Sequence, residues 1–152
     1  MTIHDKDPWY QSFRDLIAVE VSALREQTQS QVNYFWQQHH ETHATRPYDE
    51  WGRLGLRLRD RSVVFGIEWY LNSYYGPRKK RVVVSKAVTL AADRSAKLAE
   101  VTSKLKAWEL ELTQSLEPQF TIVRRQLDEF VKMNLRAQIY VQRKQKLRST
   151  NG

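Results

Sequence analysis

The sequence predicts an α+β fold with an N-terminal amphipathic helix, a three-stranded antiparallel meander and long C-terminal helices. Three observations support it. Apolar residues recur at helical spacing over 8–38, alternate with period two over 53–84, and return to helical spacing over 91–146. The chain has 152 residues, 41% of them hydrophobic, so we expect one folded domain over 1–152.

The first helix is predicted over residues 8–38. Asp7 is a suitable N-cap, and Pro8 suits the first helical position because its missing N–H costs nothing there. An apolar stripe follows at helical spacing: Phe13, Ile17, Val21, Leu24, Val32 and Phe35. We interpret His39, His40 and His43 as a polar helix end and residues 41–50 as a loop. Their spacing does not match the zinc-protease motif, so no metal site is expected.

The meander is predicted over residues 53–84. Its strands are expected at about 53–59 and 63–71 and from 78–81 through Val84, with a longer turn over 72–77. In the first strand the leucines at 54, 56 and 58 alternate with arginines, which gives one apolar and one basic face. Glu68 is expected to pair with an arginine across the sheet.

Long C-terminal helices with a kink or break near Pro118 are predicted, because Pro118 interrupts a long apolar stripe whose phase continues past it. One long helix kinked at Pro118 is an alternative, and two helices at about 91–116 and 118–146 are favoured. Residues 147–152 are expected to form a disordered tail. The near-heptad stripe over 98–130 is typical of a core face or a coiled-coil seam, so a homodimer through this seam is one interpretation.

Positive charge is concentrated in two zones. Residues 53–86 contain nine Lys and Arg against two acidic residues, and residues 124–148 contain eight against two, while the rest of the chain is acidic. This clustering favours a polyanionic partner, most often nucleic acid. The N-terminus lacks a signal-peptide pattern and no run is apolar enough to span a bilayer, so we expect no membrane partner.

The candidate nucleic-acid-binding residues are cations and aromatic residues in these zones: Arg53, Arg57, Arg59, Arg61, Tyr74, Tyr75, Arg78, Lys79, Lys80, Arg81, Arg143, Lys144 and Lys146. Arginines on a strand face can meet phosphates or a guanine edge in the major groove. Tyrosines among cations suit single-stranded nucleic acid. This interpretation requires Arg57 and Arg59 to be exposed and not paired with acidic residues.

Enzymatic chemistry is not indicated. The chain has no cysteine, no glycine-rich phosphate loop and no G-x-S-x-G motif, and its acidic residues fall mostly on predicted helix surfaces. We therefore expect a non-enzymatic protein with no cofactor, no metal and no small-molecule substrate.

The order of parts resembles the MobI family, small accessory proteins of conjugative transfer. The resemblance covers about residues 10–140. It is carried by Phe65-Gly66-Ile67-Glu68-Trp69-Tyr70, the basic run 78–81, Trp108-Glu109, Glu117 and Ile122-Val123-Arg124-Arg125. It implies a non-enzymatic factor of the bacterial cytoplasm that binds double-stranded DNA at the origin of transfer and assists the relaxase.

Two alternatives stay open. One is a helical protein–protein adaptor that uses the apolar stripe as its interface and binds no specific nucleic acid. The other is an RNA-binding regulator, because basic sheet faces with aromatic residues also bind RNA.

Overall fold

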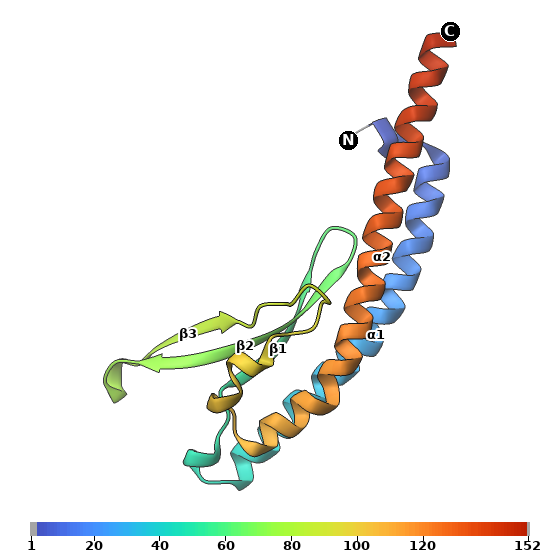
Figure 1. Ribbon diagram of the computed structural model, residues 1–152. Helices are drawn as coiled ribbons and strands as arrows, with labels where there is room; N and C mark the ends of the chain where they lie inside the picture. The colour runs from blue at the N-terminus through green and yellow to red at the C-terminus, as the bar shows by residue number, and fades with distance from the viewer. Residues whose placement is uncertain (1–2, 152) are drawn as a thin grey trace.

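The computed structural model describes residues 3–151, and the side chains of residues 5–150 except that of Arg78. Two long helices, α1 (Pro8–Thr45) and α2 (Ala107–Asn151), run antiparallel as a hairpin. A three-stranded sheet lies against the part of this hairpin where α1 ends and α2 begins (Figure 1). The predicted α+β order is therefore confirmed. Of the helices described, none is long and apolar enough to cross a membrane.

Helix α1 begins as predicted. The Asp7 carboxylate accepts a hydrogen bond from the Tyr10 amide at 3.0 Å, and Pro8 occupies the first turn. Its end was predicted wrongly, because the helix continues past residue 38 to Thr45 and includes the three histidines. Pro47 accounts for the actual end, since a residue before proline avoids helical backbone angles and Arg46 is extended.

The sheet has the order β1-β2-β3 and is antiparallel throughout. Its strands are β1 (Leu54–Asp60), β2 (Phe65–Tyr75) and β3 (Val82–Ala87). The predicted turn over 72–77 was placed too early, because residues 72–75 continue β2 and pair with β3. The chain reverses instead at Gly76, whose φ of +91° is rarely open to other residues, and through the turn Arg78–Lys80.

The helix predicted from residue 91 is wrong in its first half. Residues 88–106 form irregular backbone with short 3-10 turns at Leu98–Glu100 and Thr102–Lys104. The Asp93 carboxylate accepts hydrogen bonds from both the amide and the hydroxyl of Ser95, and Arg94 adopts a φ of 71°. Such local side-chain bonds compete with helix formation, while Leu98, Val101 and Leu105 still pack against the core.

Helix α2 is continuous from Ala107 to Asn151, so the favoured division at Pro118 is wrong and the alternative of one helix through that residue is correct. Pro118 and Gln114, whose carbonyl loses its helical partner, are both exposed, so water can satisfy that carbonyl. The expected disordered tail is also contradicted over residues 147–151, which are helical; Gly152 lies outside the described residues.

The apolar stripe of α2 is buried within the chain. Trp108, Leu112, Leu116, Phe120 and Leu127 pack in one cluster with α1 and with the inner sheet face formed by Leu54, Leu56, Phe65, Ile67 and Trp69. The residues of the 98–130 seam, which the sequence suggested as a homodimer or adaptor interface, are therefore already engaged in packing within this chain.

Buried charges fasten the sheet to α2. Glu109 is fully buried and accepts hydrogen bonds from the Lys106 amide at 2.9 Å and the Leu54 amide at 2.8 Å, which caps α2 and anchors β1. Glu117 accepts from Trp69 Nε1 at 2.7 Å and pairs with buried Arg124 at 2.5 Å. The expectation that acidic residues lie on helix surfaces was wrong for these two.

Candidate nucleic-acid interface

The outer face of the sheet is basic but partly neutralised. Arg57 lies opposite Glu68 and donates from Nε to its carboxylate at 2.6 Å, which confirms the predicted cross-strand pair. The Arg59 guanidinium reaches the other oxygen of Glu68 at 3.4 Å, and that of Arg57 lies 4.7 Å from the centroid of the Tyr70 ring. Both arginines are exposed, as the interpretation from the sequence required. That interpretation also required them to have no acidic partner, and this part is wrong because both pair with Glu68.

Arg53 and Arg61 flank this pair at the two ends of β1. Both are exposed, and no ion pair among the described side chains involves either of them. The guanidinium of Arg53 lies 5.9 Å from the ring centroid of Tyr74, and that of Arg61 lies beside Gly66. These two arginines therefore keep their full charge towards solvent.

The distal part of the β2–β3 hairpin, residues 72–85, extends beyond β1 as a two-stranded ribbon, which we call the arm. Figure 1 shows it projecting away from the helices. Val82 and Val83 lie on opposite faces of the arm and are 60% and 52% exposed, so both faces are largely open to solvent there. Tyr74 and Tyr75, predicted in a loop, lie in β2 on opposite faces of the arm and are exposed.

The tip of the arm carries the basic run. Lys79 and Lys80 are exposed and form no ion pair with the described side chains. Arg81 is also exposed and donates to the hydroxyl of Tyr48 at 3.0 Å. Arg78 begins the tip turn, and its side chain lies outside the described part of the chain. Unpaired cations on a projecting ribbon form the strongest feature for binding a polyanion.

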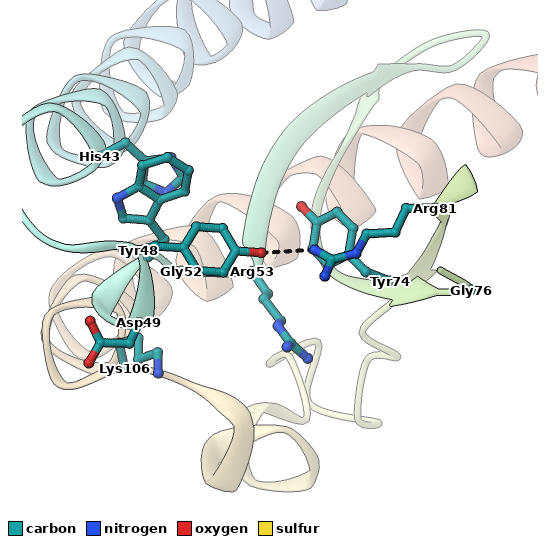
Figure 2. A pocket seen from close by; sticks show the side chains of 10 residues that line it. His43, Tyr48, Asp49, Gly52, Arg53, Tyr74, Gly76, Arg81 and Lys106 are labelled. Atoms are coloured by element: carbon teal, nitrogen blue, oxygen red, sulfur yellow. Dashed lines mark hydrogen bonds between the residues drawn. The ribbon is translucent and has the colours of Figure 1, made fainter. Parts of the chain in front are cut away.

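A cavity of about 800 Å³ opens where the arm meets the rest of the molecule. Figure 2 shows that its side chains come from separate segments: His43 from α1, Tyr48 and Asp49 from the following turn, Arg53 before β1, Tyr74 and Arg81 from the arm, and Lys106 before α2. Trp51 also lines it and stacks on His43 with ring centroids 4.5 Å apart. The cavity therefore combines three aromatic residues with three cations.

The second basic zone lies away from the first. Arg143 and Lys146 are exposed near the C-terminal end of α2, at the far end of the hairpin from the arm (Figure 1). Lys144 instead pairs with the Asp7 carboxylate at 2.8 Å and lies against the rings of Trp9 and Tyr140. The hydrogen bond from Lys144 and that from the Tyr10 amide lower the pKa of Asp7. Lys144 thus fastens α2 to the start of α1, and we leave it out of the interface.

The histidines of α1 lie at a partly buried aromatic cluster. The rings of His39 and His43 are 4.0 Å apart, and His39 also contacts Trp36 and Trp108. Burial, followed by the neighbouring His43 and His40, lowers the pKa of His39 to about 4. Burial likewise lowers the pKa of His43. Among the described side chains, no group of three or more potential ligands is arranged to hold a metal ion.

Several contributors to this surface were missed in the sequence. The cavity is also lined by Tyr48, Trp51 and Lys106. These residues lie in segments that were predicted as loop or as helix and were not considered as binding residues. The sequence does show aromatic residues and a cation on either side of the basic strand. The spacing of these residues along the chain does not reveal that the turn after α1, the arm and the start of α2 lie close together in the fold. The start of α2 carries only half of a capping box, because Glu109 stands in the third position but Lys106 occupies the place of the usual Ser, Thr, Asp or Asn.

Comparison with protein families gives a match. A family model described as MobI protein matches residues 24–138, which include most of α1, the whole sheet and α2 through Gln138. No curated protein matches the chain. No solved structure matches it either.

Proposed function

The chain belongs to the MobI family, and on that premise we propose that it is a non-enzymatic, DNA-binding accessory factor of conjugative transfer. Family membership indicates a role in conjugative mobilisation. In this proposal the protein works in the bacterial cytoplasm, binds the double-stranded DNA of the transfer origin and presents it to the relaxase.

The observation that carries the proposal is the arm. Its four residue pairs, Asn72 with Ser85 through Tyr75 with Val82, give a ribbon about 14 Å long at about 3.4 Å per residue. A two-stranded ribbon fits the major groove of B-DNA, which is about 12 Å wide. Lys79 and Lys80 at the tip would then meet phosphates, which supplies affinity and position but no sequence reading.

The paired arginines have a secondary role in this proposal. Arg57 and Arg59 are 43% and 55% exposed, but the Glu68 side chain between them is only 17% exposed, so a phosphate would compete with Glu68 for these arginines and gain less from them than from unpaired cations. The arm and the outer sheet face are continuous through β2, so DNA in contact with Lys79 and Lys80 can extend along this face. Arg53 lies between the two and would link them.

The test is binding to a fluorescently labelled transfer-origin duplex and to a scrambled duplex, measured by anisotropy across a salt titration. Each phosphate contact contributes about 0.9 to the slope of log K against log salt concentration. We expect a steep slope for the native chain and a slope lower by about 1.8 for Lys79→Ala/Lys80→Ala. The matched control is Arg143→Ala/Lys146→Ala, which removes the same charge at the far end and should leave the slope unchanged.

Equal and weak binding of both duplexes, unaffected by Lys79→Ala/Lys80→Ala, would exclude the arm as a DNA-binding element. An RNA duplex of the same sequence is included, and tighter binding of that RNA would favour the RNA-binding alternative. Arg57→Ala/Arg59→Ala separates the contribution of the sheet face from that of the arm.

A further inference from the structure

The cavity at the base of the arm contains Tyr48, Trp51 and Lys106, which the proposed duplex binding does not use. We propose that it holds one unpaired nucleotide of single-stranded DNA, with the base against the aromatic side chains and the phosphate on the cations. This inference deepens the proposed function and rests on DNA being the partner.

The aromatic walls suit a nucleobase. Tyr48 is 65% exposed, and its hydroxyl is held by Arg81 at 3.0 Å, so the ring is fixed while much of it remains accessible. One face of Trp51 is covered by His43 in a nearly parallel stack, with 8° between the planes, and its indole N–H donates to the Arg46 carbonyl at 3.1 Å. Rings that are fixed in this way bind a flat base with little loss of conformational freedom.

The charges suit a phosphate. Arg53, Arg81 and Lys106 line the cavity, and none of them forms an ion pair with the side chains that the structure describes. Asp49 is the one acidic residue among the lining side chains described, so positive charge dominates. This differs from the sheet face, where Glu68 neutralises part of the charge of Arg57 and Arg59.

The volume and position favour an unpaired nucleotide over a duplex. About 800 Å³ is within the range of small-molecule pockets and accommodates a nucleotide, but not a base pair within a stacked helix. Bases in a duplex are stacked on both faces, whereas an unpaired base can leave the stack and lie on an aromatic ring. Tyr74 and Arg81 belong to both the arm and the cavity, so DNA in the groove and a displaced nucleotide would be held side by side.

The test compares a 20-base-pair duplex with the same duplex carrying a gap of three unpaired thymidines, both labelled and measured by anisotropy. We expect the native chain to bind the gapped DNA at least fivefold more tightly, because base–aromatic stacking contributes on that scale. Tyr48→Ala should remove this preference and leave affinity for the intact duplex unchanged. Tyr34→Ala, an exposed tyrosine on α1 with no contact to the cavity, is the matched control and should behave as the native chain.

Tryptophan emission gives an independent readout. Saturating gapped DNA should quench the emission of the native chain, and the Trp51→Phe variant should lack that component while still binding. Lys106→Ala should weaken binding of gapped DNA more than binding of the intact duplex. Both variants leave the basic tip of the arm intact, so they act on the cavity alone.

The outcomes separate this inference from the proposed function. Equal affinity of the native chain for gapped and intact duplexes would overturn the nucleotide site while leaving duplex binding by the arm in place. A gap preference that survives in both Tyr48→Ala and Lys106→Ala would overturn it as well. Binding of gapped DNA without binding of intact duplex would reject the proposed arm function and support the cavity. A gap of three uridine ribonucleotides bound more tightly than the thymidine gap would overturn the assignment to DNA.

Discussion

Arg124→Met is the substitution whose cost can be worked out most directly from the structure. Arg124 is 3% exposed, pairs with Glu117 at 2.5 Å and donates to the carbonyls of Ile67 and Arg94. Methionine keeps an unbranched apolar side chain but leaves the Glu117 carboxylate buried without its cation. Breaking a buried pair from one side costs about 3–5 kcal/mol, a large part of a typical stability of about 5–15 kcal/mol.

The assay is equilibrium unfolding in urea followed by tryptophan fluorescence, since Trp69 lies in the same hydrogen-bond network. A loss of about 4 kcal/mol with a slope of about 2 kcal/mol per molar urea lowers the midpoint by about 2 M. Arg125→Met is the matched control. Its side chain is 57% exposed and lies 3.9 Å from the Asp93 carboxylate, so we expect a change within about 0.5 kcal/mol.

The double variant Glu117→Met/Arg124→Met tests whether the cost comes from the uncompensated charge. It should be less destabilised than the two single variants added together, by a coupling energy of about 1–3 kcal/mol, because removing both partners leaves no isolated charge. Arg124→Met and Arg125→Met with equal stabilities would refute the assignment of this pair to the core.

Two further predictions concern stability. Since folding lowers the pKa of His39 from 6.5 to about 4, the unfolded chain binds the proton more readily, and stability should be complete above pH 6.5 and decrease as the pH falls towards 4. The shift corresponds to about 3.4 kcal/mol at most, and partial exposure reduces our expectation to about 1–2 kcal/mol, measured by urea unfolding from pH 7 to 4.5. His39→Gln should flatten most of this dependence, whereas His40→Gln should retain the larger part of it, because burial is the main cause of the lowered pKa of His39 and exposed His40 is the smallest; the reverse would contradict the assignment. Gly52→Ala should destabilise by about 1–3 kcal/mol, because its methyl group would collide with the Glu109 carboxylate and the Trp108 ring, which are both buried. Gly66→Ala, where the nearest atom is the flexible Arg61 side chain at 3.4 Å, should cost less, and urea unfolding of both variants measures the difference. Equal destabilisation by the two variants would contradict the close packing at Gly52.

The sequence predicted the structure correctly where side-chain periodicity or a local capping pattern determines it. Period-two alternation placed β1 and its leucine face almost to the residue, and the cap at Asp7 and Pro8 placed the start of α1. The cross-strand partner of Glu68 was also predictable, because an acidic residue in a basic meander has arginines opposite it. Each of these features depends on residues close in the chain or paired in one hairpin.

Element ends were less predictable. Residues 39–45 have no strong helical stripe, yet they are helical because Thr42 packs into the core and nothing before Pro47 stops the helix. Residues 91–106 have helical apolar spacing, yet local bonds at Asp93 and capping of α2 at Lys106 by Glu109 place them outside a helix. In both segments packing and capping override the periodic signal.

By itself the sequence determined the kinds of element, their order and the apolar face of each, because these follow from side-chain periodicity along a single segment. The tertiary structure alone decided which charges remain free. It buried Glu109, Glu117 and Arg124, paired Lys144 with Asp7, and left Lys79 and Lys80 exposed at the tip of the arm. It also brought Tyr48, Arg53, Arg81 and Lys106 around one cavity. Ion pairs, burial and cavities depend on distances between segments remote in the chain, and no local pattern fixes those distances.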